Sequence, residues 1–274
     1  MKEFEDKIQV LESEKFGNAV FEICTIEDLE GVTNPNMAMQ LYFAKQQGLK
    51  IRFVRIKLND EKIKTEAGAL YYYKGNIEAN SEIGGLGGFV KKSISGKLTG
   101  ESILKPTYKG CGDIYLEPSF MHYIMLPLEN NSIIVDKSMF YCCSDSINIR
   151  PIVQKNVSSA LLGNEGLIQM ELYGTGMVIL ESVVPENELQ KINLNPGEEL
   201  KVDGNFAVLR SSNVVFNVTT SEKSLIASSM NGEGLLNTYR AKTPGTVWLA
   251  PTAPIYKKLY GAGMLSNANR NNLS

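Results

Sequence analysis

Apolar residues at every second position mark several stretches of this chain. Ile147 and Ile149 are two residues apart, as are Val214, Phe216 and Val218. A period of two is typical of a strand with one buried face, because successive side chains point to opposite sides of a sheet. These stretches predict a chain built mainly of β-strands.

One stretch near the N-terminus follows a helical pattern instead. Asn34-Pro35 precedes it and Gly48 follows it, with apolar residues at helical spacing between them: Met37, Leu41 and Ala44. Proline suits the first turn of a helix, and glycine suits the residue just beyond its end. The sequence therefore predicts a short helix between these two signals.

A strand is expected directly after this helix, from Leu49 to Leu58. Its apolar positions are two apart as far as Phe53 and then change phase at Val54. One extra residue in a strand produces such a change, so the pattern predicts a β-bulge there.

A repeated order of residues recurs three times in the chain. The similar segments are 100–104, 164–168 and 232–236, and each precedes a glycine and a strand-like run at a nearly constant distance. These glycines are Gly112, Gly176 and Gly245. Glycine before a strand suits a tight turn that needs a positive φ, so we expect a turn at each of them.

The other half of the repeat recurs at 134–140 and 201–207, with a weaker first copy at 66–70. One module buries too little apolar surface to be stable alone. We therefore expect an all-β fold, a β-sandwich or double-stranded β-helix-like body of three modules with pseudo-threefold symmetry, plus a short N-terminal helix. The expected boundaries are 1–49 for an N-terminal extension, 50–250 for a single domain (modules 50–120, 121–184 and 185–250), and 251–274 for a C-terminal tail.

Composition and charge narrow the classes of function. The formal net charge is −2, which argues against a nucleic-acid partner. The first thirty residues carry acids and no long apolar run, and no stretch approaches the roughly 18 apolar residues that a membrane-spanning helix needs. The four cysteines form no Cys-x-x-Cys pair, which favours reduced thiols. We expect a cytoplasmic protein.

Repeated acids are the first candidate chemistry. They occupy equivalent positions of the modules: Glu101, Glu165 and Glu233 in one set, and Glu66, Asp136 and Asp203 in the other. Carboxylates around a threefold axis could bind Ca²⁺ or act as acid and base. Turn residues that bond nearby backbone amides would show the same pattern, and we expect this structural role.

His122 is the only histidine in the chain. A metal centre with several histidines is therefore excluded, as is a Ser-His-Asp triad in each module. We expect no catalytic residues, no metal and no cofactor.

A glycine-rich segment followed by lysines is the second candidate, as a contact loop. Its apolar and basic residues are Leu86, Phe89, Val90, Lys91, Lys92 and Lys97. Apolar groups beside lysines suit contact with a subunit, a protein partner or an anionic membrane. The alternatives are a solvated charged face and apolar residues that fold back into the core.

Several blocks together resemble a known family. The segments 66–70, 75–77, 100–102, 110–112, 232–234 and 244–247 are similar to the altered inheritance of mitochondria family, number twenty-four. The resemblance implies a β-sandwich or double-stranded β-helix, similar to the tryptophan RNA-binding attenuation protein, and an oligomer. It implies a role in organising the inner membrane for mitochondrial relatives, and it carries over no catalytic residue. The absence of a presequence favours a bacterial member.

Three classes of function remain open. The first is a non-enzymatic scaffold or binding module, which we expect to be a homo-oligomer that acts at a membrane surface or on a protein partner. The tyrosine run 71–73 favours a subunit contact, because its side chains occupy both faces of a strand. The alternatives are a small-ligand or RNA-binding protein, suggested by fold analogy, and an enzyme that uses the repeated carboxylates.

Overall fold

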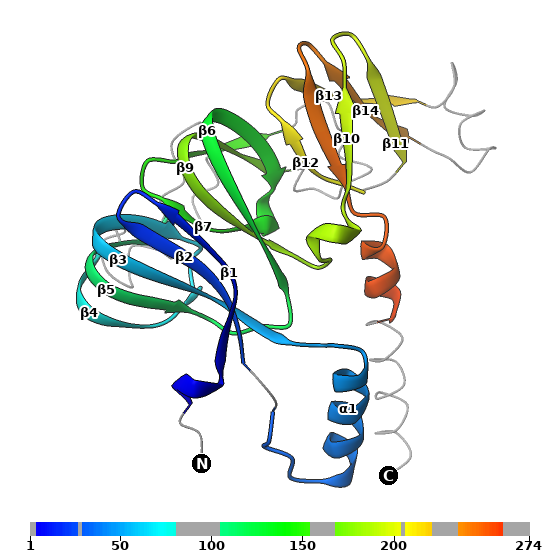
Figure 1. The fold of residues 1–274 in the computed structure, drawn as a ribbon. Helices are drawn as coiled ribbons and strands as arrows, with labels where there is room; N and C mark the ends of the chain where they lie inside the picture. Colours follow the sequence, from blue (N-terminus) through cyan, green and yellow to red (C-terminus); the bar gives the residue numbers. More distant parts are fainter. Residues whose placement is uncertain are drawn as a thin grey trace, which may run out of the picture. The chain divides into compact units, whose positions relative to one another are not determined.

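The computed structural model describes residues 4–26, 29–80, 105–153, 168–203, 206–220 and 235–259. The protein is mostly β, with antiparallel sheets and two short helices, so the predicted β class is confirmed (Figure 1). The helices are α1 (Pro35–Gln46) and a segment at 253–259, and the 3-10 turns are η1 (Glu5–Lys7), η2 (Lys137–Met139) and η3 (Glu186–Glu188). The strands are β1 (Ile8–Phe16), β2 (Ala19–Ile26), β3 (Ile51–Thr65), β4 (Leu70–Asn80), β5 (Thr107–Leu116), β6 (His122–Asp136), β7 (Phe140–Ser144), β8 (Asn148–Val153), β9 (Ile168–Ser182), β10 (Gln190–Leu194), β11 (Glu199–Asp203), β12 (Ala207–Ser211), β13 (Val214–Thr220), β14 (Leu235–Ala241) and β15 (Gly245–Leu249).

Internal contacts divide the chain into two compact units. The first comprises Met1–Asn130, Phe140–Asn148 and Gly174–Ser182, and the second comprises Asn131–Met139, Ile149–Tyr173 and Val183–Ser274. Strands β6 and β9 therefore each contribute one part to each unit.

Strand β3 is central to the first unit. Its first half pairs with β2, its residues from Arg55 to Lys64 pair with β5, and its last residues pair with β7. Strand β1 continues the sheet beyond β2, and β4 continues it beyond β5. The N-terminal segment thus contributes two strands, β1 and β2, that sequence analysis did not predict.

The two faces of β3 lie in different apolar clusters. Val54 and Ile56 belong to the main core of the unit, together with Phe21, Ile114 and other fully buried side chains. Phe53 faces the opposite side, in a smaller cluster with Cys24 and Tyr115. Each such side chain contributes roughly 1.5–3 kcal/mol when fully buried.

The predicted β-bulge is wrong for this reason. Phe53 and Val54 are both buried because β3 is covered on both faces, and its pairing with β2 runs without interruption through them. The irregularity in β3 lies further on, where its pairing with β5 shifts between Asn59 and Glu61 and Asp60 has a φ of 53°. The strand also continues to Thr65, beyond its predicted end at Leu58.

The second unit contains two sheets of antiparallel strands. In one, β12 lies between β6 and β15, and β15 pairs with β10. In the other, β14 lies between β11 and β13. Val214, Phe216 and Tyr239 are buried in the apolar cluster of this unit. Glu188 anchors the segment at 253–259 by accepting hydrogen bonds from Thr252 Oγ1 at 2.6 Å and Tyr256 Oη at 2.9 Å.

The predicted helix is confirmed as α1. Asn34 is its N-cap, and Asn34 Oδ1 accepts a hydrogen bond from the Met37 amide at 3.0 Å. Pro35 is its first residue, and Gly48 lies beyond its end with a φ of 69°. Figure 1 shows α1 outside the strands of the first unit, at one end of the sheet.

The expectation of tight turns at three glycines is wrong. Gly112 and Gly176 lie inside β5 and β9, and Gly245 is the first residue of β15. Only Gly112 among them has a positive φ, of 150°. The close approach of the neighbouring strand β4 explains the glycine there, since a Cβ on Gly112 would lie 2.2 Å from the carbonyl oxygen of Lys74.

Replacing Gly112 with alanine should destabilise the first unit. Both the close contact with β4 and the positive φ oppose a side chain, so we expect a loss of about 3 kcal/mol in the free energy of unfolding, measured in urea. Gly68→Ala is the matched control, because Gly68 has a φ of 84° but nothing within 4 Å of a Cβ. It should lose only about 1 kcal/mol. Equal losses for the two variants would contradict the close-approach explanation.

Candidate functional site

Helix α1 carries apolar side chains that the described part of the chain leaves exposed. Seven of its twelve residues are apolar, and none is buried. Met39, Tyr42 and Phe43 are 56%, 61% and 60% exposed. A helix that is apolar on all sides is normally a buried helix. The exposure of α1 therefore makes it the candidate contact surface of the described residues.

The local stability of α1 leads to the same conclusion. An isolated helix of about 12 residues is marginal in water, and packing of an apolar face normally supplies the missing stability. No residue of α1 is buried, so its Asn34 cap and its first-turn proline are the stabilising features that remain. A partner that covers α1 would supply what packing does elsewhere.

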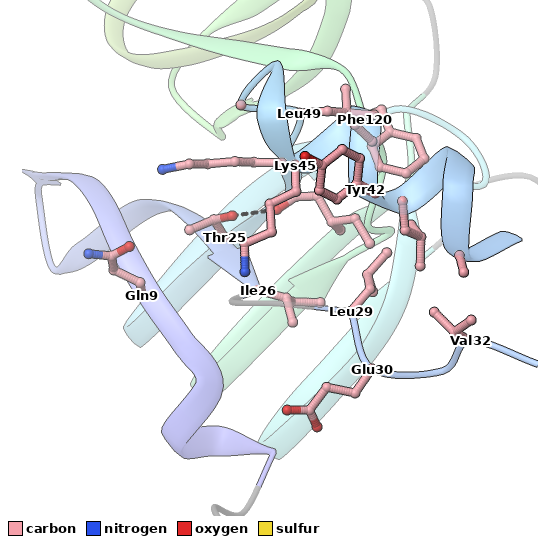
Figure 2. Close-up of a pocket in the computed structure, with 16 residues that line it drawn as sticks. Gln9, Thr25, Ile26, Leu29, Glu30, Val32, Tyr42, Lys45, Leu49 and Phe120 are labelled. Atoms are coloured by element: carbon pink, nitrogen blue, oxygen red, sulfur yellow. Dashed lines mark hydrogen bonds between the residues drawn. The ribbon is translucent and has the colours of Figure 1, made fainter.

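A cavity lies between α1 and the strands β1 to β3. Its volume is about 850 Å³. Figure 2 shows its walls, with the helix above and the strands and the 29–32 segment around it. Its apolar lining residues are Ile26, Leu29, Val32, Ala38, Leu41, Tyr42, Ala44, Leu49, Ile51 and Phe120. Ligand sites in proteins have this size and this apolar character.

The two sides of α1 have different surroundings. Ala38, Leu41, Tyr42 and Lys45 line the cavity, at the spacing of three and four residues that places side chains on one face of a helix. Met39 and Phe43 are four residues apart, do not line the cavity and are exposed, and we call these two the outer residues of α1.

The described lining residues of the cavity include three charged side chains. Lys45 and Lys50 line it, as does one carboxylate, Glu30, which is ion-paired with Lys7 at 2.6 Å. Thr25 Oγ1 donates a hydrogen bond to the Ile51 carbonyl oxygen at 2.7 Å, which ties β2 to the start of β3 (Figure 2). The lining residues include no histidine and no cysteine.

The thiols of this chain are poor nucleophiles, with one exception. Cys24, Cys142 and Cys143 are buried. Burial raises the pKa of Cys24 to about 11 and that of Cys143 to about 12, and it raises the pKa of Cys142 well above its usual value. Cys111 is exposed in β5, where its sulfur accepts a hydrogen bond from the Asp60 amide at 3.2 Å.

Two of the repeated acids have structural partners. Glu66 is ion-paired with Lys105, and it also accepts a hydrogen bond from the Ala67 amide at 3.1 Å. Asp136 Oδ1 accepts hydrogen bonds from the amide and the hydroxyl of Ser138, at 2.9 and 2.7 Å. Asp203 ends β11. These contacts favour the structural role, which stays a prediction for the set, because Glu101, Glu165 and Glu233 lie outside the described residues.

The other predicted sites are described only in part. The proposed contact loop, with Leu86, Phe89, Val90, Lys91, Lys92 and Lys97, lies outside the described residues. His122 is the first residue of β6. Within the described ranges, no three His, Cys, Asp or Glu side chains are arranged to hold a metal ion. The helices found in those ranges are too short or too polar to span a bilayer.

Sequence analysis missed the exposed surface of α1. It predicted the helix but not that its apolar residues are uncovered. One signal was available, because no acidic residue occurs between Gly31 and Leu58, and the basic residues of that stretch are Lys45, Lys50, Arg52, Arg55 and Lys57. An apolar helix in a stretch without acids is unusual for a solvent-exposed element.

Comparison with known proteins first supports the class of the fold, which is mostly β with antiparallel sheets. A crystal structure of protein SPYM3_0169 from Streptococcus pyogenes is similar, with a TM-score of 0.56 and 21% identity. The match covers 80% of this chain and 94% of that one. At this identity the similarity shows the fold alone. Curated protein sequences gave no match.

The family follows from a profile match over residues 43–252. The chain belongs to the family described as mitochondrial biogenesis AIM24. This confirms the resemblance drawn from the sequence blocks. The match begins at Phe43, so it covers the last four residues of α1 and all of β3, whereas Met37 and Met39 precede the matched part.

Thiol labelling should distinguish Cys111 from the other cysteines. At pH 8 a chromogenic thiol reagent should modify one thiol per chain quickly, because the buried thiols are protonated and covered. The remaining three should react only after unfolding in urea. Cys111→Ser should remove the fast phase. A second fast-reacting thiol in the native protein would contradict this assignment.

Removing the α1 cap should loosen the helix without unfolding the protein. Asn34→Ala deletes the acceptor for the Met37 amide, which costs about 1 kcal/mol and corresponds to roughly fivefold faster hydrogen exchange in α1. Asn36→Ala is the control, because Asn36 lies inside the helix and does not cap it. Unchanged exchange in Asn34→Ala would show that something other than the cap holds α1.

Proposed function

We propose that this chain is a non-enzymatic binding module that attaches to an anionic membrane surface through α1. The observation that carries the proposal is the exposure of the outer residues Met39 and Phe43 on a helix with no buried residue. Helices that lie in a membrane interface insert aromatic and aliphatic side chains below the headgroups.

Charge favours a membrane over a protein surface of mixed sign. Lys50 follows the apolar residues of α1 closely, and no acid occurs between Gly31 and Leu58. Basic residues beside a membrane-bound segment each contribute about 1 kcal/mol of attraction to anionic lipid. Arg55 and Lys57 add little to this attraction, because both are ion-paired with the buried Glu22.

The chemistry of the cavity supports a non-enzymatic role. Among its described lining residues, the carboxylate of Glu30 is ion-paired, and none carries an imidazole or a thiol for proton transfer or nucleophilic attack. The exposed cysteine, Cys111, lies in β5 and is not one of its lining residues. The proposal retains the predicted homo-oligomer, in which several copies of α1 would bind one membrane more strongly than a single copy.

We also propose that the three-module architecture is real. Strands β7 and β12 have equal lengths, and their bounds differ by a constant 67 residues. A Cβ on Gly176 would meet Ser144, Ser146 and Ile147, whereas one on Gly245 would meet Asn213 and Val214, which follow β12 as Ser146 and Ile147 follow β7. These equivalent contacts support the repeat for the second and third modules, at glycines that lie close to neighbouring residues. An experimental structure in which 140–153 and 207–220 do not superpose would overturn it.

Vesicle sedimentation tests the membrane proposal. The wild-type chain should sediment with vesicles that contain phosphatidylserine and remain in solution with pure phosphatidylcholine, and added salt should release it. Met39→Ser with Phe43→Ser should reduce binding about tenfold or more, because burial of each side chain is worth roughly 1.5–3 kcal/mol. Light scattering on each variant shows whether the oligomeric state is unchanged.

The matched control is Tyr71→Ser. Tyr71 is as exposed as Phe43, at 60%, but it lies on β4. It should bind vesicles as the wild type does. If the wild-type chain fails to bind anionic vesicles, or if Tyr71→Ser loses as much binding as the α1 variant, the proposal is wrong.

A further inference from the structure

We propose that the outer edge of β4 pairs with the same edge of a second copy of this chain, as antiparallel strands related by a twofold axis at Asn76. The inference goes beyond the proposed function, because it names an interface for the homo-oligomer that the proposed function leaves unspecified. It rests on residues of β4 and β5 and does not depend on α1 or on a membrane.

Strand β4 lies at an edge of its sheet. In the described part of the chain it pairs with one strand, β5, and Figure 1 shows it at the outer edge of the first unit. Eight of its eleven residues are exposed. Gly75 is among them, and since glycine has no side chain, its exposure is exposure of the backbone. An edge of this kind presents amide and carbonyl groups that pair readily with another strand.

The charges on β4 are self-complementary in an antiparallel pair. Lys74 and Glu78 are both exposed, and they lie on one face of the strand with Asn76 midway between them. When Asn76 faces Asn76 of the second copy, Lys74 faces Glu78 of that copy, and the twofold axis makes the same contact twice. Opposite charges directly across two strands are stabilising, whereas like charges there are destabilising.

This register also continues a charge pattern that the sheet already contains. On β5, Asp113 lies opposite Lys74, and Lys109 lies opposite Glu78. Pairing of two β4 strands would therefore give a row of alternating charge across four strands. A shift of the register by two residues in either direction would place Lys74 opposite an asparagine and would remove this row.

The sizes of the side chains on the other face fit the same register. Tyr73 faces Ala79 of the second copy, and Gly75 faces Ile77 of that copy. Each large side chain thus faces a small residue, as close packing requires. Tyr73 is 40% exposed, so part of its ring remains for a second copy to cover.

Complementary charge reversals test the interface. By native mass spectrometry without lipid, the wild-type assembly should contain an even number of chains. Lys74→Glu and Glu78→Lys each place like charges opposite each other, so each variant should dissociate about tenfold more readily. An equimolar mixture should reassociate, because the mixed pair restores both opposite-charge contacts. Contacts with β5 are the same alone and in the mixture, so reassociation reports on the interface. A monomeric wild type, or a mixture that stays dissociated, would overturn the proposal.

A cysteine on the twofold axis tests the register. Asn76 would face its own copy at a Cα separation of roughly 4.5–5.5 Å, which a disulfide can bridge. The background is Cys111→Ser, because Cys111 lies opposite Asn76 in the same chain. Asn76→Cys should then form a covalent dimer under mild oxidation, and Asn80→Cys should not, because its two copies lie at opposite ends of the paired stretch. Absence of the Asn76→Cys dimer, or equal crosslinking of both variants, would contradict the register.

These measurements are distinct from the vesicle experiment. A wild-type chain that passes both tests without binding vesicles would reject the membrane proposal and leave the interface intact. Dissociated Lys74→Glu should still bind vesicles through α1, but more weakly, because it binds with fewer copies of α1. Tyr71→Ser remains the control, since Tyr71 lies at the irregularity in the pairing between Leu70 and Tyr72, outside the paired stretch 72–80. It should leave the assembly intact.

Discussion

Strand β3 is the element on which the rest of the first unit depends. It is hydrogen-bonded to β2, β5 and β7, and apolar clusters cover both of its faces. Between its apolar residues, Arg55 pairs with Glu22 at 2.5 Å, so that a buried carboxylate is neutralised within the sheet. Removal of one partner from such a pair leaves an uncompensated charge, so β2 and β3 are held in a single register.

The fixed pairing of β2 with β3 also determines where the cavity lies. Helix α1 precedes β3 by only a few residues, and the start of β3 is fixed to β2 by the hydrogen bond from Thr25 Oγ1 to the Ile51 carbonyl oxygen. The C-terminal end of α1 is therefore tethered at the end of the sheet. No residue of α1 is buried, so the space between the helix and the strands remains open.

Local patterns in the sequence were sufficient to predict that the fold is mostly β and that α1 is a helix. Alternation around Ile149 and Phe216 reflects strands with one buried face, and Asn34-Pro35 and Gly48 act as helix boundaries through contacts within a few residues. Predictions from local patterns were wrong where contacts with strands distant in the sequence determine the structure. Phe53 and Val54 resembled a bulge because apolar side chains on both faces of β3 bury them, and Gly112 is a glycine because β4 passes close to it.

The candidate site was hidden for a related reason. Met39 and Phe43 are visible in the sequence as apolar residues, but a sequence with a helical pattern does not tell whether a helix packs on its own protein. The predicted contact surface, at 86–97, lies outside the described residues, whereas the surface found on α1 comes from exposure measured in three dimensions. The absence of acids around α1 was readable from the sequence, and together with its all-round apolarity it was the signal of an uncovered helix.

The exposure of α1 has a thermodynamic consequence. A helix of this length loses conformational entropy when it forms, and α1 has no buried residue whose packing would offset that loss. A membrane that covers Met39 and Phe43 would therefore supply part of the free energy that orders the helix. Linkage requires the converse as well: a substitution that stabilises α1 in solution should raise the affinity of the chain for the membrane by the factor by which the membrane stabilises the helix.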